Sequence, residues 1–349
     1  MGKERGRQER TPVLWMFIHG AIASAIGIAA GIAIEWFPEQ GSTQARTVDT
    51  VWDVLIVASV PIFVAVMIIV LFSVRNFRMR PGEENLDGPP IHGNTKLEIY
   101  WTAGPAIILV ALCSYSYVEL RNIEESQPNE MRINVTGQQF AWSFEYPGVG
   151  GKPVKSTELV LAKDKPVRFI VRSPDVLHDF WVPAFRMKID AVPGIDTSYR
   201  ITPARLGEYP VVCAELCGLG HSVMRNTARV VTAAQFDAWV AKQRGPAQAS
   251  AAAGDKPDGK VLFAEGNGTA QACGSCHTLA DAGTSSTTGP DLGKVLAGQD
   301  AAAIRESIVK PSAKLTAGFD DLMPKDYDGT LSAEELNALV EYLTKAAAK

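Results

Sequence analysis

The stretch CAELCGLGHSVM, which begins at residue 213, gathers soft metal ligands within twelve residues. Cys213 and Cys217 lie four positions apart, His221 follows four positions later, and Met224 comes three positions after that. Thiolates and imidazoles with a weak thioether are a ligand set that suits copper in electron transfer. Because the loop supplies two thiolates, both sulfurs can bridge two copper ions. The loop therefore indicates a binuclear copper site with Met224 as a weaker ligand.

The second histidine of such a site must come from elsewhere in the chain. His178, in SPDVLHDFWVP, is the only histidine between His92 and His221. Two cysteines with two histidines are also a common structural zinc set, and a disulfide between Cys213 and Cys217 is a further alternative outside the cytoplasm. Zinc sites usually contain a closely spaced histidine pair, which His178 and His221 do not form. The spacing therefore favours copper over zinc.

A second motif, ACGSCHTL, places Cys273, Cys276 and His277 in the C-x-x-C-H pattern. This pattern attaches c-type heme through two thioether bonds, with the histidine as proximal iron ligand. Downstream, Pro290 lies in TGPDL, where its carbonyl can accept a hydrogen bond from the other imidazole nitrogen. Met323, in LMPK, is the candidate distal ligand, and a thioether in that position raises the reduction potential. A thioredoxin-like redox pair is the alternative, but the motif lacks a βαβ context.

The composition sets limits on what the rest of the chain can be. The 349 residues allow two or three domains, and 46% of them are apolar. The net charge of −4 gives no indication of a nucleic-acid partner.

Three apolar stretches in the first third approach the ~20 residues that cross a bilayer as a helix. They cover residues 13–34, 54–74 and 99–118. Basic residues flank them at Lys3, Arg5, Arg7, Arg10, Arg75, Arg78, Arg80 and Lys96. The positive-inside rule places these flanks in the cytoplasm and everything after Glu119 outside.

The first apolar stretch has two interpretations. Its basic start and small residues also suit a signal peptide, but its length favours a retained helix. We assign residues 1–50 to an N-terminal apolar helix or signal segment with an outer loop, and residues 51–125 to a two-helix transmembrane hairpin.

The remaining chain divides into two folded parts and a linker. Segments rich in Val, Ile, Phe and Trp, separated by turn residues, predict an all-β sandwich or barrel over residues 130–243, ending in a helical AAQFDAWVAKQ. Residues 244–258 are small residues with Pro and Gly, typical of a linker whose alanines could make part of it helical. Residues 259–349 are predicted to form helices, and Ser332 with Glu335 forms a capping box before the last one.

The motifs resemble subunit II of heme–copper cytochrome c oxidases, joined to a class I cytochrome c. CAELCGLGHSVM fits that family's pattern C-x-E-x-C-G-x-x-H-x-x-M, and SPDVLHDFWVPAFRMKIDAVPG fits its stretch around the first histidine ligand. The resemblance implies a multidomain membrane protein with N-terminal transmembrane helices, an all-β cupredoxin-like sandwich and an all-α cytochrome c domain. It implies copper ligand roles for His178, Cys213, Cys217, His221 and Met224. Glu215 would give its carbonyl to copper and its carboxylate to a magnesium ion shared with subunit I.

Two further stretches resemble the same family. KLEIYWTAGPAIILV matches the start of its second transmembrane helix, which implies that Glu98 lies at the entrance of a proton path; an interfacial carboxylate beside Lys96 is the alternative. GQQFAWSFEY matches an aromatic stretch through which electrons arrive from outside. Phe140 stands where the family usually has its first tryptophan, while Trp142 keeps the second. This difference suggests another donor surface, and the C-terminal heme is a candidate donor within the same chain.

The resemblance implies an electron-input subunit of a proton-pumping terminal oxidase in a bacterial cell membrane. We expect partners in subunits I and III, in the lipid bilayer, and in an external donor such as a cytochrome c or a respiratory complex. No residue of this chain is expected to be catalytic, because oxygen would be reduced in subunit I. The alternatives are a nitric oxide reductase with a copper-bearing subunit and a membrane-anchored electron carrier that works without a catalytic partner.

Overall fold

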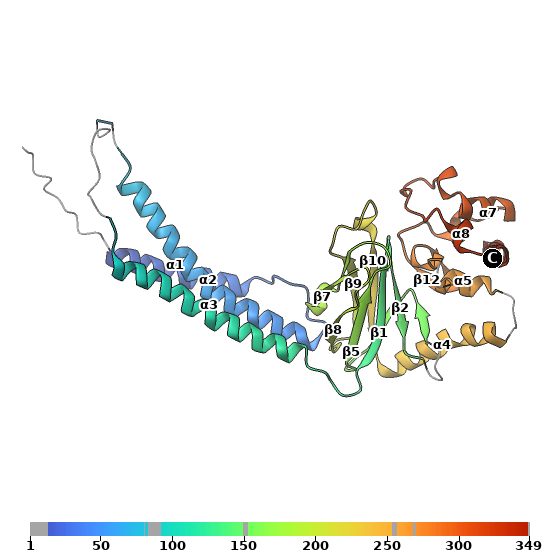
Figure 1. Ribbon diagram of the computed structural model, residues 1–349, viewed down its shortest axis with the longest axis horizontal. Coiled ribbons are helices and arrows are strands. Elements are labelled where there is room, and N and C mark those ends of the chain that lie inside the picture. The colour runs from blue at the N-terminus through green and yellow to red at the C-terminus, as the bar shows by residue number, and fades with distance from the viewer. Residues whose placement is uncertain are drawn as a thin grey trace, which may run out of the picture. The chain divides into compact units, whose positions relative to one another are not determined.

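The computed structural model describes residues 13–79, 81–82, 92–148, 153–252, 257–267 and 270–347 (Figure 1). The basic residues before position 13, together with Arg80, lie outside the described residues. Contacts within the chain define two units, which are described separately below. The units are Met1–Phe37 with Arg46–Asn122, and Pro38–Ala45 with Ile123–Lys349.

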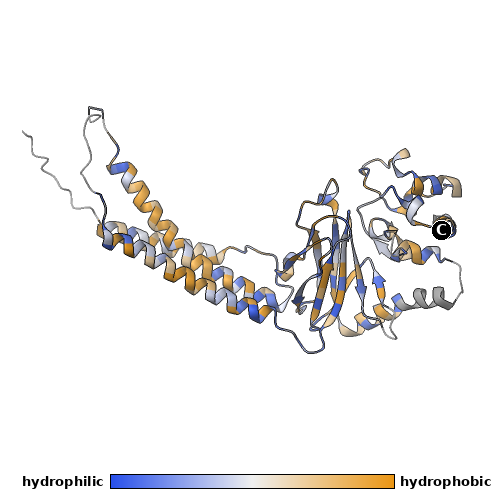
Figure 2. Cartoon of the chain, viewed as in Figure 1, coloured by the Kyte–Doolittle hydropathy of each residue, from blue (hydrophilic) through white to orange (hydrophobic). Residues whose placement is uncertain are grey.

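The first unit consists of long apolar helices. In the described part of the chain, three helices are long and apolar enough to cross a membrane: α1 (Val13–Ala33), α2 (Thr43–Asn76) and α3 (Thr95–Ile123). Figure 2 shows apolar residues over most of their length. Helices α2 and α3 extend beyond the apolar stretches of the sequence, because polar residues at their ends continue the same backbone hydrogen bonding.

Helix α1 packs against α2 through its glycines. A Cβ built on Gly27 would lie 2.8 Å from Cγ1 of Val60, and one built on Gly31 would lie 2.8 Å from Cγ2 of Ile56. This small-xxx-small spacing lets two helices approach closely in a bilayer, where van der Waals packing rather than the hydrophobic effect holds helices together. The glycines of α1 therefore fit it to α2.

The second unit begins with a β-sandwich. Within the described residues its two sheets have five strands each, in the orders β3-β2-β1-β5-β8 and β4-β10-β9-β6-β7. The strand bounds are β1 Met131–Gln138, β2 Ala141–Tyr146, β3 Val154–Ser156, β4 Leu159–Ala162, β5 Val167–Arg172, β6 His178–Trp181, β7 Lys188–Ala191, β8 Thr197–Ile201, β9 Gly207–Cys213 and β10 Arg225–Val231. The predicted all-β fold is confirmed. Strands β3, β4 and β7 span only three or four residues, too few for alternation along the sequence to predict them.

An aromatic cluster fills the core between the sheets. Phe180 of β6 contacts Trp142 of β2 and Phe169 of β5, with ring centroids 5.2 and 5.4 Å apart. All three side chains are fully buried. Edge-to-face packing of this kind stabilises a core beyond the area that it buries. The same cluster supports the end of β6, where His178 lies.

Helix α4 (Ala233–Ala252) covers one end of the sandwich. Its Trp239 lies 5.0 Å from the ring of Tyr146, and Phe236 joins the same contact. The helix continues to Ala252, so the first part of the predicted linker over residues 244–258 is helical. Residues 253–256 of that linker lie outside the described residues.

The C-terminal part is helical, as predicted. Its α-helices are α5 (Gly259–Glu265), α6 (Leu292–Val295), α7 (Ala301–Val309), α8 (Tyr327–Thr330) and α9 (Ala333–Ala347). Helix α5 crosses α9 at Gly259, where an added Cβ would lie 2.1 Å from the carbonyl oxygen of Ala338. The predicted capping box is confirmed, because Ser332 N donates to Glu335 Oε2 at 2.8 Å and Glu335 N donates to Ser332 Oγ at 3.2 Å.

Candidate copper and heme sites

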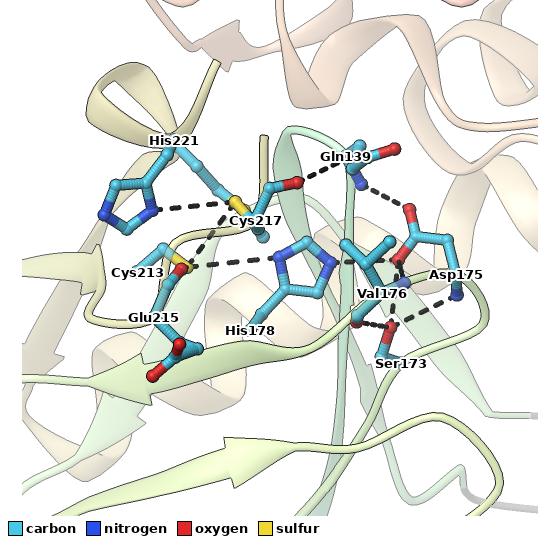
Figure 3. A network of polar contacts seen from close by, with 10 residues as sticks. Gln139, Ser173, Asp175, Val176, His178, Cys213, Glu215, Cys217 and His221 are labelled. Atoms are coloured by element: carbon cyan, nitrogen blue, oxygen red, sulfur yellow. Dashed lines mark hydrogen bonds and ion pairs between the residues drawn. The ribbon is translucent and has the colours of Figure 1, made fainter. Parts of the chain in front are cut away.

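The sulfur and imidazole groups of the copper loop converge on one point (Figure 3). The Cys213 and Cys217 sulfurs lie 3.8 Å apart, too far for a bond between them, and both thiols are free. Nδ1 of His178 lies 3.9 Å from Cys213 Sγ, and Nδ1 of His221 lies 3.6 Å from Cys217 Sγ. Met224 Sδ lies 3.8 Å from Cys217 Sγ. The five side chains therefore form one set of soft donors.

The sixth residue proposed for this site, Glu215, lies in the same loop. Its backbone carbonyl oxygen is 3.1 Å from Cys213 Sγ, while Figure 3 shows its carboxylate turned away from the two sulfurs. The carbonyl can thus contribute to a metal bound by the sulfurs, while the carboxylate remains available for a different contact.

Three elements of the sandwich position these side chains. His178 begins β6, Cys213 ends β9, and the short 3₁₀ helix His221–Val223 precedes β10. Strands β6 and β9 are antiparallel neighbours that pair Phe180 with Cys213. The pairing brings His178 to the copper loop although the two are far apart in sequence.

Asp175 orients the imidazole of His178. Its Oδ1 lies 2.9 Å from Nε2 of His178, so Nε2–H donates to the carboxylate and Nδ1 faces the sulfurs. Asp175 also accepts hydrogen bonds from Gln139 N at 2.8 Å and from Ser173 Oγ at 2.9 Å. Burial opposes the charge of Asp175, but these hydrogen bonds outweigh it and lower its pKa. The carboxylate is therefore ionised at neutral pH and fixes the tautomer of His178.

The environment distinguishes the two thiols. Burial raises the pKa of Cys213, but contacts with His178 and with the backbone around Asp179 and Glu215 outweigh it and lower that pKa to about 7. Burial and the neighbouring Cys213 raise the pKa of Cys217 to about 12. In the metal-free loop, one thiolate thus forms readily, while burial and repulsion from the first thiolate hold the proton of Cys217.

Several residues that surround the loop were not predicted from the sequence. Gln139 Nε2 donates to the Cys217 carbonyl at 2.5 Å, which ties the β1–β2 turn to the loop. Asp179 and Asp190 face each other across β6 and β7, and Asp179 Oδ1 has no hydrogen-bond partner among the described residues. Burial raises the pKa of Asp179 to about 6. These contacts join distant segments, so spacing along the sequence does not reveal them.

The heme motif lines a cavity of about 920 Å³ in the C-terminal part. Its lining includes Cys273, Cys276 and His277 of the motif, and Met323 from the loop before α8. A cavity of this size accommodates a large cofactor and is lined mainly by apolar groups, which a heme requires. The structure therefore brings all four predicted heme residues to one cavity.

The fifth predicted residue, Pro290, holds the imidazole of His277. The Nδ1–H of His277 donates to the Pro290 carbonyl at 2.9 Å, which leaves Nε2 free to bind iron. Gly289 packs against the ring, because an added Cβ would lie 2.7 Å from Cε1 of His277. Burial lowers the pKa of His277, so the ring is neutral, as a metal ligand must be.

The remaining predicted residues lie apart from these donor sets. Glu98 is in the first turn of α3, and its Oε1 accepts a hydrogen bond from Asn94 N at 3.1 Å, so it also caps the helix. Trp142 is fully buried, and its ring lies 6.1 Å from that of His178. Phe140 is half-buried and lines the heme cavity.

A cupredoxin-like sandwich with a soft donor loop, a helical heme-binding part and membrane helices together define a membrane-bound electron-transfer protein. Comparison with known families is consistent with each part. The family model described as cytochrome C oxidase subunit II, transmembrane domain, matches residues 29–118, and the periplasmic-domain model matches residues 152–231. The cytochrome c model matches residues 258–347. The chain belongs to the cytochrome c oxidase subunit II family and carries a C-terminal cytochrome c domain.

Individual relatives are also subunits II of cytochrome c oxidases. Cytochrome c oxidase subunit 2 of Thermostichus vulcanus is 32% identical over 279 residues, which cover 65% of this chain and 84% of the relative. Cytochrome c oxidase subunit 2 of Alkalihalophilus pseudofirmus is 30% identical over 308 residues, which cover 83% of this chain and 84% of the relative. The solved periplasmic domain of subunit II from Bradyrhizobium japonicum is 32% identical, with a TM-score of 0.33, covering 34% of this chain and 97% of that one.

Family membership gives the general setting. The chain is part of a heme–copper oxidase, which contains further subunits, and its two soluble domains imply copper and heme. It is a membrane protein whose soluble part matches a periplasmic domain. The predicted family and fold class are confirmed.

Proposed function

We propose that this chain is the electron-input subunit of a proton-pumping terminal cytochrome c oxidase in a bacterial cell membrane. It passes electrons from a donor through covalent heme c and then a binuclear copper centre to the oxygen-reducing site in subunit I. The observation that carries the proposal is that one unit of the chain contains both a convergent set of soft copper donors and a C-x-x-C-H motif lining a large cavity. When bound, copper and heme supply one-electron transfer with little rearrangement.

The arrangement of donors supports two copper ions rather than one. Each sulfur has its own histidine, His178 beside Cys213 and His221 beside Cys217. Each sulfur also has one weak donor beside it, the Glu215 carbonyl or the Met224 thioether. A single tetrahedral ion would need only two thiolates and two histidines and would leave both weak donors unused.

The heme assignment rests on the C-x-x-C-H motif and on the hydrogen bond that orients its histidine. Cys273 and Cys276 would form the thioether bonds, His277 would be the proximal ligand and Met323 the distal one. The hydrogen bond to Pro290 keeps His277 in the tautomer that binds iron through Nε2.

Four residues have proposed roles at the boundary with subunit I or with a donor. The Glu215 carboxylate, which faces away from the sulfurs, would bind magnesium together with subunit I. Glu98 would lie at a proton-path entrance, in addition to capping α3 through its contact with Asn94. Phe140 and Trp142 would lie on the route by which electrons reach copper. Trp142 is fully buried against His178, so Phe140 forms the outer part of that route.

The domain boundaries are proposed as follows. Residues 51–125 form the transmembrane hairpin, 130–243 the copper domain, 244–258 the linker and 259–349 the cytochrome domain. We propose that α1 is retained as a membrane helix, since its glycines pack against α2. N-terminal sequencing of the purified chain tests this; a mature chain that starts after Ala33 would show α1 to be a cleaved signal.

Subunits I and III and an external cytochrome c or respiratory complex are the proposed partners. The test of the whole proposal is metal and heme analysis of the purified chain, with optical and electron paramagnetic resonance spectra. We expect two coppers and one covalent heme per chain, and the multi-line signal of a mixed-valence copper pair. The variants Cys217→Ser and Cys276→Ser should each abolish one signal and leave the other. Zinc at the copper loop, or a heme that organic solvent extracts, would contradict the proposal.

A further inference from the structure

The loop that supports the heme histidine contacts the copper loop directly. Thr288 Oγ1 donates a hydrogen bond to the Val223 carbonyl at 3.2 Å. Thr288 lies two residues before Pro290, which holds His277. Val223 is the residue before Met224 in the copper loop. One hydrogen bond thus joins the segments that carry a proposed ligand of each centre.

Phe140 makes a second contact between the same two regions. Its ring lies against the backbone of the copper loop, because an added Cβ on Gly220 would lie 2.5 Å from Phe140 Cδ2. A Cβ on Gly218, the residue after Cys217, would lie 3.2 Å from Phe140 Cε1. The same ring lines the heme cavity. Only glycines let the ring approach the loop so closely.

The contact surface continues beyond these two points. Strand β2 contacts the 3₁₀ turn Cys273–Ser275, and β3 contacts α5. Lys155 of β3 and Glu265 of α5 line one cavity of about 280 Å³, so opposite charges face the same space. The copper domain therefore contacts the side of the cytochrome domain on which the C-x-x-C-H motif lies.

We infer that the cytochrome domain docks on the copper domain through this surface, with the Thr288–Val223 hydrogen bond as the contact that positions the two centres for electron transfer. The inference rests on the proposed function. It identifies a route through bonds and hydrogen bonds, which runs from His277 through Pro290 and Thr288 to the backbone of Val223 and Met224. Electrons tunnel more readily along such a route than across a gap between two surfaces.

Docking also decides which partner can use the copper loop. Phe140 of the copper domain lines the heme cavity, and Thr288 of the cytochrome domain bonds to the copper loop. In this docked arrangement the chain's own cytochrome domain occupies that face of the copper domain. An external protein donor must then deliver its electron to the cytochrome domain.

The test compares full-length, metal- and heme-loaded chains carrying Thr288→Val, Thr288→Ser or Phe140→Ala. Thr344→Val is the matched control, because its hydroxyl donates only within its own helix, to the Val340 carbonyl at 2.8 Å. The first readout is amide hydrogen exchange of peptides covering residues 218–224 and 284–290. The second is the rate of electron transfer to copper after photochemical reduction of the heme, with spectra and potentials of both centres recorded separately.

We expect Thr288→Val to speed amide hydrogen exchange in both peptides and to slow electron transfer from heme to copper about fivefold. Losing one hydrogen bond lowers the docked population by about that factor, and transfer requires docking. Thr288→Ser should restore both readouts, Phe140→Ala should also slow transfer, and Thr344→Val should resemble the wild type. Unchanged exchange and transfer in Thr288→Val and Phe140→Ala, with both centres loaded, would overturn the docking inference and leave the proposed function intact. A wild-type chain in which reduced heme never reduces copper would instead contradict the proposed function.

Discussion

Asp175 and His178 form a pair in which the carboxylate Oδ1 lies 2.9 Å from Nε2 of a fully buried imidazole. The other ring nitrogen faces Cys213 Sγ at 3.9 Å. Neither nitrogen can exchange its role with the other, because Asp175 is itself held by Gln139 and Ser173. The pair therefore sets the direction in which His178 presents its lone pair to a metal.

Removing this carboxylate should weaken metal binding without unfolding the sandwich. We expect Asp175→Ala to lower copper affinity roughly 10- to 100-fold, the usual effect of losing a partner of a ligating histidine. Competition with a copper chelator measures the affinity, and circular dichroism checks the fold. Asp237→Asn, an exposed change on α4, is the control. Equal affinity in Asp175→Ala and the wild type would show that packing alone orients His178.

Metal uptake by the copper loop should depend on pH in two regimes. With pKa values of about 7 for Cys213 and about 12 for Cys217, uptake above pH 7 displaces one thiol proton, and uptake below pH 7 displaces two. Affinity should therefore rise with pH, about tenfold per unit above the Cys213 pKa and more steeply below it. Proton release measured with an indicator dye, using Zn²⁺ as a redox-inert probe, tests this.

The matched variant for that measurement is Cys217→Ser. It removes the thiol whose proton is retained at neutral pH, so proton release above pH 7 should fall by about one proton per ion bound. Release that does not change between pH 6 and pH 8 in the wild type would contradict the assignment of the two thiols.

A side chain at position 289 should disturb the heme site. The added Cβ of Gly289→Ala would lie 2.7 Å from Cε1 of His277, so the imidazole must move away from the Pro290 carbonyl. We expect the covalent heme to remain while its absorption spectrum shows weakened histidine ligation. Gly329→Ala is the control, since nothing lies within 4 Å of its added Cβ. A Gly289→Ala spectrum identical to the wild type would exclude a role for this close packing.

The capping box of α9 should make the cytochrome domain sensitive to acid. The hydrogen bond from Ser332 N is the largest cause that lowers the pKa of Glu335, and Asn267 adds another. A carboxylate with a lowered folded-state pKa stabilises the fold above its unfolded pKa, near 4.3, and loses that effect as pH falls through the folded value.

Glu335→Gln should therefore be less stable than the wild type at neutral pH, and the difference should shrink as the solution is acidified. Chemical denaturation at a series of pH values measures the free energy of unfolding. Ser332→Ala, which removes the reciprocal cap, should cost about 1 kcal/mol at neutral pH. A difference between Glu335→Gln and the wild type that grows toward low pH would reverse the sign argued here.

The local motifs can be recognised from the order of the residues. The spacing of Cys213, Cys217, His221 and Met224 suits a compact loop, and the Cys273–His277 motif needs only one turn of backbone. Apolar runs likewise indicate the membrane helices locally, because a helix in a bilayer satisfies its backbone groups within its own segment. Each of these features depends on residues that lie in the same loop, turn or helix.

Short-range spacing and composition were enough to predict the loop of soft donors, the C-x-x-C-H motif, three helices long and apolar enough to cross a membrane, and the division into β and helical parts. Only the folded chain shows that β6 and β9 pair to bring His178 to Cys213, that Asp175 orients His178, and that Thr288 bonds to Val223. Such contacts form between segments separated by many residues, where chain entropy, strand register and packing choose the partners. No spacing along the chain encodes them directly.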